Sequence, residues 1–267
     1  MAISTFIPKV WSARLLENYR RALVIGALCN RNYEGDIAQW GDTVHVGHLA
    51  DITVKPYTPN VDIDDPEQLD ADDRVLTIDH GAYFNFYVND VDAAQARAEL
   101  MEPAMRNAAH KLAEDTEDYL VGKIVEEAGV KLSGSLKADN VYEQIVAIKT
   151  AMDEKNVPKS GRFLVVPASV ESALLLDSRF ISAGIQGENR LAEGSVARAA
   201  GFDIFLSNAL SDKVLAFTQD CVTFAQQIVK TEAYRREKGF DDGVKGLSLC
   251  GAKVVLPECT FVYTITG

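Results

Sequence analysis

The sequence is poor in the residues that form disulfide frameworks and metal sites. Its 267 residues include four cysteines and four histidines, and no two cysteines are spaced as Cys-x-x-Cys. This pattern indicates neither a disulfide framework nor a zinc site, and it fits a reducing compartment. The chain also lacks an apolar run of about 18 residues and, at its start, the pattern of a signal peptide. We therefore expect no membrane partner and no export.

Positive charge is scarce as well. The chain has 27 lysines and arginines against 39 aspartates and glutamates, which gives a formal net charge of -12. A protein that grips nucleic acid through its phosphates needs clustered basic residues. We therefore expect no specific binding of nucleic acid.

Much of the negative charge lies in one stretch, NVDIDDPEQLDADDRV at residues 60–75. Its seven carboxylates, with no basic residue among them, are Asp62, Asp64, Asp65, Glu67, Asp70, Asp72 and Asp73. Calcium binds clustered carboxylates in EF-hand loops, but here Glu67 stands where such a loop needs glycine and Pro66 falls at a ligand position. The stretch fits a solvated acidic loop or a protein contact better than a calcium site.

The segments on either side of this acidic stretch predict a long β-hairpin. Residues 43–57 and 74–88 alternate loosely between polar and apolar side chains. At about 3.3 Å per residue, each arm would reach on the order of 50 Å. A two-stranded ribbon is at best marginally stable in water. With Tyr83, Phe84 and Phe86 at its base, this one should need a surface to lie on, which another molecule could supply.

Apolar residues at helical spacing occur on both sides of the hairpin. A short amphipathic helix is expected from Trp11 on an N-terminal arm. Two further helices are expected at 92–102 and 104–128, because Pro103 should kink or restart the helical run. Gly129 is well placed to end the second of these.

The following region alternates between helices and strands. Asn140 is the expected cap of a helix that ends at Asn156 in a left-handed conformation. The apolar run RFLVV at 162–166 predicts a buried strand, followed by a helix capped by Ser169. The connection 178–200 is longer than compact domains usually tolerate without a function.

No catalytic centre stands out in the sequence. The turn VVPASVES lacks the glycine and lysine of a phosphate loop. His45 and His48 are three residues apart on a predicted strand and so point to opposite faces, which argues against a shared metal. We expect no catalytic residue, no cofactor and no metal. The basic run YRREK at 234–238 is either a solvated strand end or the partner of a carboxylate-rich surface.

Several segments, taken in order, resemble a single family. They are IPKVWSARLLENYRRALVIGALCNRNYEGDIAQWGDTVHV, FYVNDVDAAQA, AMRNAAHKLAEDTEDYLVGKI, GRFLVVPASVESALLLDSRF, AAGFDIFLSNAL and RREKGFDDGVKGLSLCGAKVVLPE. Across essentially the whole chain, this order resembles the major capsid (coat) proteins of tailed bacteriophages, whose fold is shared with encapsulin shells. The resemblance lies in the order of the segments and not in a single motif.

The resemblance implies an α+β fold in four parts. These are an N-terminal arm at 1–40, an extended β-hairpin loop at 41–89, a peripheral domain at 90–134 and 221–267 with a long spine helix, and an α/β axial domain at 135–220. The irregular connection in the axial domain would lie near the centre of a capsomer.

The resemblance also implies a structural function. The chain would assemble with itself into pentamers and hexamers of an icosahedral shell around phage double-stranded DNA, without enzymatic activity and without specific binding of the DNA. A separate scaffolding protein and a portal are expected partners, first in the host cytoplasm and then in the virion capsid. The alternatives are an encapsulin-type compartment around protein cargo and, from a different class, an α/β enzyme that uses residues 162–207.

Such a shell suggests a role for the acidic stretch. Residues 62–73 should contact a basic surface on an adjacent subunit, with Arg235, Arg236 and Lys238 as the first candidates. One exposed ion pair contributes only about 0 to 1 kcal/mol, so these charges would set register more than strength. The expected apolar interface residues are Trp11, Tyr83, Phe84 and Phe86.

Overall fold

The computed structural model describes most of the chain after residue 22. The described residues are 23–33, 40–49, 54, 56–57, 59, 71–137, 139–177, 198–235 and 241–266. The helix expected from Trp11 and the acidic residues 62–70 lie outside them, as do the connection 178–197 and the basic residues Arg236 and Lys238.

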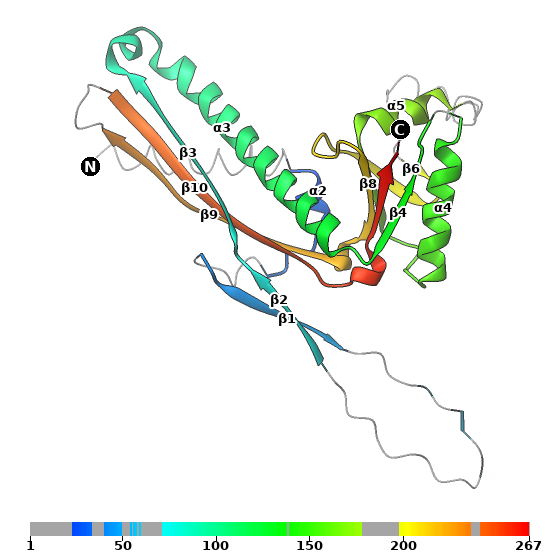
Figure 1. The fold of residues 1–267 in the computed structure, drawn as a ribbon. Coiled ribbons are helices and arrows are strands. Elements are labelled where there is room, and N and C mark those ends of the chain that lie inside the picture. Colours follow the sequence, from blue (N-terminus) through cyan, green and yellow to red (C-terminus); the bar gives the residue numbers. More distant parts are fainter. Residues whose placement is uncertain are drawn as a thin grey trace.

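One half of the fold is a six-stranded mixed sheet with two helices packed on one face (Figure 1). Its strands are β4 (Val130–Gly134), β5 (Arg162–Val166), β6 (Arg198–Ala199), β7 (Phe202–Leu206), β8 (Lys213–Thr218) and β11 (Phe261–Ile265), in the order β4-β11-β8-β5-β7-β6. The helices are α4 (Val141–Glu154) and α5 (Ala168–Leu176). The pairs β4-β11 and β5-β7 are parallel, and β8 is antiparallel to both of its neighbours.

Both faces of this sheet are buried. Side chains alternate along each strand, so successive residues belong to different cores. In β5, Leu164 and Val166 belong to the core beneath α4 and α5, and Val165 belongs to a second core on the opposite face. All three side chains have no exposed surface. The run RFLVV therefore forms the buried strand that it predicts.

The other half is a long helix that lies along a three-stranded antiparallel sheet (Figure 1). The helix is α3 (Asp90–Glu127), and the sheet has the order β3 (His80–Asn89), β10 (Asp241–Val254), β9 (Val222–Arg235). The expected division of the helix at Pro103 is wrong, since α3 is continuous over 38 residues. Pro103 is exposed, and a proline removes only one helical hydrogen bond, which a helix of this length can lose.

The second core joins the two halves. Leu120 and Ile124 of α3, Phe224 of β9, Val244 of β10 and Phe217 of β8 belong to one apolar cluster. One apolar cluster therefore extends from α3 and the three-stranded sheet to the far face of the six-stranded sheet.

A two-stranded ribbon extends from the three-stranded sheet (Figure 1). β1 (Thr43–Leu49) pairs antiparallel with β2 (Ala71–Thr77). Each strand has seven residues, which is about 23 Å. The expected arms at 43–57 and 74–88 are therefore wrong in extent. The second arm ends early because β3 leaves the ribbon and pairs with β10.

Of the two expected helix caps, one is confirmed in position and one is wrong. Asn140 is the N-cap residue of α4, but its side chain makes no cap bond to the helix, and its Oδ1 accepts the backbone N–H of Lys137 at 2.7 Å. Pro167, not Ser169, is the N-cap residue of α5. The expected end of α4 is confirmed, with Asn156 in the left-handed region at φ 56.

The C-terminal strands belong to two different sheets. β9 and β10 lie in the three-stranded sheet, whereas β11 joins β4 in the six-stranded one. The sheet of β4 and β11 thus also contains strands from the region 135–220, and the division into four parts stays a prediction. Among the described residues, the remaining short helices are α2 (Ile25–Leu28), η2 (Gln219–Cys221) and η3 (Pro257–Cys259). Within the described ranges, no helix combines the length and the apolar character needed to cross a membrane.

Candidate subunit interface

The outer face of the three-stranded sheet exposes large apolar side chains. Because side chains alternate along β3, Tyr83 and Tyr87 lie on the face opposite to α3. Tyr83 is 78% exposed and Tyr87 is 58% exposed. Leu247 of β10, which stands opposite Tyr83 in the register, is 37% exposed. Contiguous exposed apolar side chains of this kind mark interaction surfaces.

A pocket of about 380 Å³ lies on this face. Its lining residues are Tyr83, Phe84, Asn85, Glu232, Lys245, Gly246 and Leu247. Its polar side chains bind one another or their neighbours: Lys245 pairs with Glu232 at 3.1 Å, and the Tyr234 hydroxyl donates to Asn85 Oδ1 at 2.7 Å. A partner would therefore meet mainly the apolar surface of Tyr83 and Leu247.

The structure separates the three aromatic residues that the sequence placed at an interface. Phe84 and Phe86 are half-buried and pack against the core beneath α3, with their ring centroids 5.9 Å apart. Part of the surface that Phe84 and Phe86 need is thus supplied by their own chain, and their place in a subunit interface stays a prediction. Tyr83 is the exposed one of the three.

The charged candidates are at opposite ends of the molecule. Arg235 is the exposed last residue of β9, and the backbone of Asp72 and Asp73 lies in β2. In Figure 1 the end of β9 and the open end of the ribbon point in opposite directions. A contact between the acidic stretch and Arg235 would therefore join two copies of the chain. The other candidates lie outside the described residues: Asp62, Asp64, Asp65, Glu67, Asp70, Arg236, Lys238 and Trp11.

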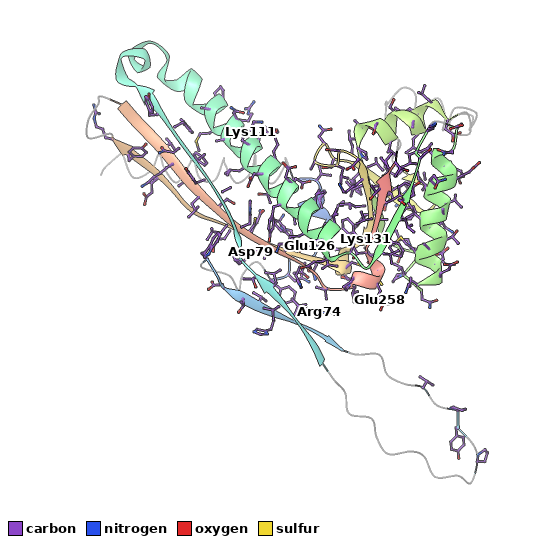
Figure 2. The ribbon with its side chains drawn as sticks, viewed as in Figure 1. Arg74, Asp79, Lys111, Glu126, Lys131 and Glu258 are labelled. Atoms are coloured by element: carbon purple, nitrogen blue, oxygen red, sulfur yellow. The ribbon has the colours of Figure 1, made fainter. Side chains whose placement is uncertain are left out.

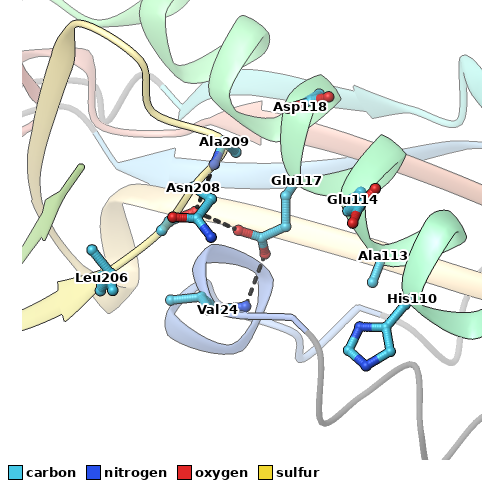
Figure 3. A pocket seen from close by; sticks show the side chains of 10 residues that line it. Val24, His110, Ala113, Glu114, Glu117, Asp118, Leu206, Asn208 and Ala209 are labelled. Atoms are coloured by element: carbon cyan, nitrogen blue, oxygen red, sulfur yellow. Dashed lines mark hydrogen bonds between the residues drawn. The ribbon is translucent and has the colours of Figure 1, made fainter. Parts of the chain in front are cut away.

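A buried carboxylate joins three distant segments (Figure 3). Glu117 of α3 is 5% exposed and accepts the backbone N–H groups of Val24, Ile25 and Gly26 at 3.0 to 3.1 Å. The Ser207 hydroxyl, after β7, donates to it at 3.4 Å. Burial raises the pKa of Glu117, and these four donors lower it only in part. Sequence reasoning missed this residue, because a glutamate within AEDTEDY has the pattern of a solvated helix surface.

A second pocket, of about 430 Å³, opens beside Glu117 (Figure 3). His110, Glu114 and Asp118 line it from successive turns of α3, and the loop after β7 forms the opposite wall. Ser207 donates its hydroxyl to Glu117, whose other donors are backbone groups. These contacts hold α2, α3 and the loop together, and they do not assemble a nucleophile with a base.

Burial raises the pKa of three of the four thiol groups, those of Cys29, Cys250 and Cys259. Cys29, Cys221 and Cys250 are buried and Cys259 is half-buried. Burial, with a smaller contribution from the charge of Asp115, raises the pKa of Cys250 to about 12. A thiol at such a pKa is protonated and unreactive at neutral pH. In the part of the chain that the structure describes, no three His, Cys, Asp or Glu side chains are grouped so that they could hold a metal.

No protein-family model and no curated protein matches this sequence. Solved structures do match it. A chain of Mycobacterium phage Che8 has a TM-score of 0.77 and 28% identity, over 90% of each chain. The capsid of the cyanophage P-SCSP1u has a TM-score of 0.73 and 15% identity, over 90% of this chain and 86% of the other. The chain has the fold of a tailed-phage major capsid protein.

The fold predicted from the sequence, α+β in the arrangement of a phage capsid protein, is therefore confirmed. This is the fold of a shell-forming structural protein. A holo-encapsulin from Synechococcus elongatus has the same fold with less similarity, at a TM-score of 0.57 and 9% identity over 85% of this chain and 83% of that chain.

Proposed function

We propose that this chain is the major structural subunit of a phage capsid and assembles with itself into pentamers and hexamers of an icosahedral shell around double-stranded DNA. One observation carries the proposal. The chain has a fold similar to phage capsid chains over about nine-tenths of its length, and this fold leaves one face of the three-stranded sheet, with Tyr83, exposed. A monomeric protein would have little reason to keep Tyr83 and Leu247 in water. A repeated contact with neighbouring copies would bury them.

The extended ribbon and the outer sheet face are the two sides of the proposed contact. The acidic stretch at 62–73 would approach Arg235, Arg236 and Lys238 of an adjacent copy. These exposed charges would contribute only about 0 to 1 kcal/mol for each pair, so they set register and angle. Burial of apolar surface, centred on Tyr83, would supply the affinity in an interface of about 1,600 Å².

The proposal includes partners besides the chain itself. A separate scaffolding protein and a portal would act with it in the host cytoplasm, and the finished shell would enclose DNA without specific contacts. A net charge of -12 supports the last point, because a negatively charged wall does not trap the incoming duplex. The chain would act as a structural subunit and not as an enzyme.

Electron microscopy combined with light scattering tests the proposal. The purified chain would be observed alone and together with any scaffolding protein encoded by a neighbouring gene. We expect closed shells or tubes with a wall of uniform thickness. A subunit that stays monomeric at every concentration, with or without the scaffold, would overturn the proposal.

A charge reversal tests the contact itself. Arg235→Glu combined with Arg236→Glu should lower the yield of shells or change their size, because the acidic stretch would meet like charges. The control, Lys155→Glu combined with Lys159→Glu, makes the same change in charge at exposed positions beyond α4. If both double variants assemble like the unaltered chain, the proposed charge contact is wrong.

The similarity to an encapsulin supports one second candidate, a compartment that encloses protein. The contents of particles isolated from the native host separate the two functions. Double-stranded DNA inside the shell supports the phage capsid, and a single abundant cargo protein supports the compartment.

A further inference from the structure

The ribbon leaves the body of the protein where one strand changes partners. β2 ends at Thr77, paired with β1, and β3 begins at His80, paired with β10. Only Ile78 and Asp79 lie between them. The backbone at these two residues therefore determines the direction of the ribbon relative to the sheet.

We call Ile78 and Asp79 the root of the ribbon. One side of this root is apolar. Ile78 is fully buried in a small cluster with Val44 and Leu76 of the ribbon and with Ala225 and Leu249 of the sheet. Apolar contacts are not directional. The cluster can therefore hold the ribbon against the sheet, and bonds with a preferred direction on the other side can restrict its angle further.

The other side of the root is polar, and Figure 2 shows Asp79 there beside α3. Asp79 accepts hydrogen bonds from the Tyr119 hydroxyl at 2.5 Å and from Lys123 Nζ at 2.9 Å. Burial opposes the charge of Asp79, but these two bonds outweigh it and hold its pKa below the usual range. The Tyr119 oxygen also accepts the backbone N–H of Ala252 at 3.4 Å, which ties the root to β10.

The next residue along the strand contacts the same stripe of α3. His80 Nε2 lies 2.6 Å from Asp115 Oδ2. The His80 ring stacks on the Tyr119 ring, with centroids 4.5 Å apart and planes inclined by 17°. Asp115, Tyr119 and Lys123 follow one another at intervals of four residues, which places them on one face of the helix.

We propose that Asp79, His80, Asp115, Tyr119 and Lys123 form a root clamp that sets the angle between the ribbon and the spine helix, and through it the curvature with which subunits join. The inference rests on the proposed function, because curvature is a property of the shell.

The exposure of the clamp supports a positioning role over a stabilising one. The paired side chains are between 27% and 49% exposed, and ion pairs with such access to water add little to the stability of a subunit. Hydrogen bonds do, however, weaken steeply when their angles change. The clamp is therefore suited to hold the ribbon in one direction relative to α3.

The length of the ribbon amplifies any change at the root. Each paired strand has seven residues. A rotation of about 10° at the root would move the end of a ribbon about 23 Å long by about 4 Å. Such a shift exceeds the length of a hydrogen bond, so the ribbon would contact a neighbouring copy in a different register.

The test removes one hydroxyl and compares two tyrosines. Tyr119→Phe keeps the ring that stacks on His80 and loses the bond to Asp79. Tyr263→Phe is the matched control, because its hydroxyl donates to Gln144 Oε1 at 3.0 Å in the six-stranded half. Hydrogen exchange of the unassembled subunit reports on the root, and electron microscopy reports the diameters of assembled shells.

We expect exchange at residues 76–81 to be about tenfold faster in Tyr119→Phe, a ratio that corresponds to about 1.4 kcal/mol. We also expect its shells to have a broader range of diameters, whereas Tyr263→Phe should match the unaltered chain in both measurements. Should Tyr119→Phe fail to fold, Lys123→Met removes the other bond to Asp79 and keeps the aliphatic stem, with the same expectations.

The outcomes separate the clamp from the proposed function. Unchanged exchange at the root overturns the clamp, and faster exchange with unchanged diameters overturns its role in curvature. If the unaltered chain forms no shell, the proposed function is wrong. Exchange at the root then decides by itself whether the clamp holds the ribbon.

Discussion

The two sheets of this protein differ in how completely their own chain covers them. In the six-stranded sheet, Leu164 faces one core and Val165 faces the other, and both are fully buried. In the three-stranded sheet, Phe84 packs toward α3, but Tyr83 on the opposite face is 78% exposed. The first sheet is buried on both faces by its own chain, whereas the second leaves apolar surface exposed, which the proposed function assigns to a neighbouring copy.

This difference separates two kinds of residue. Side chains around the six-stranded sheet and at its joint with α3 determine whether a subunit folds. In the proposed shell, side chains on the outer face of the three-stranded sheet and on the ribbon would determine how subunits meet. The root of the ribbon belongs to both classes. It packs on the body of its own subunit, and it sets the direction of the β1-β2 ribbon, which extends away from that body.

The largest effect on stability is expected at the joint between the halves. Glu117→Ala leaves the backbone N–H groups of Val24, Ile25 and Gly26 without their carboxylate acceptor. The loss should be about 3 kcal/mol or more of unfolding free energy, since buried donors would have no partner. Urea unfolding of the unassembled subunit measures it.

The control for this variant is Glu114→Ala, one turn earlier on α3. Glu114 is 62% exposed and pairs with Lys111, so its loss should change the unfolding free energy by less than about 0.5 kcal/mol. Equal stability of the two variants would mean that Glu117 does not join the halves.

A smaller effect is expected at the root of the ribbon. A Cβ atom at Gly251 of β10 would overlap the carbonyl oxygen of Thr77 in β2. Gly251→Ala should push the ribbon off the sheet and cost about 1 to 3 kcal/mol of unfolding free energy, as other overpacked positions do. Thermal unfolding measures the change. Gly47→Ala serves as the control, because no atom lies within 4 Å of a Cβ there, and an equally large loss in it would contradict the argument.

The smallest effect on subunit stability is expected on the outer sheet face. Leu247→Ser should change the unfolding free energy by no more than about 1 kcal/mol, but it should lower the yield of shells because Leu247 would be buried by a neighbour. Leu176→Ser alters another exposed leucine, at the end of α5, and should assemble normally. If shell yield falls equally in both variants, the outer sheet face has no special part in assembly.

Features with a local signal were predicted correctly. The apolar run RFLVV forms a buried strand, and Asn156 ends α4 in a left-handed conformation. Both depend on a few neighbouring residues, namely a continuous apolar run and a residue type that tolerates positive φ. The resemblance to capsid proteins likewise depends on the order of segments, which the sequence displays directly.

Features that depend on distant partners were missed or misplaced. Glu117 is separated from Val24 by 93 positions, and no pattern near it indicates burial. The alternation that predicts the second hairpin arm continues past Thr77 through β3, although that strand pairs with β10. Alternation identifies a strand but not its partner.

The sequence by itself determined the types of its elements, their order and the concentration of negative charge in one stretch, because spacing, turn residues and composition act over a few positions. Only the tertiary structure decided which strands pair, which face of the β3-β10-β9 sheet stays in water, and how Asp79 and Tyr119 meet across 40 positions. These outcomes follow from packing whole elements against one another, and the free energy of that packing depends on contacts between residues far apart in the chain.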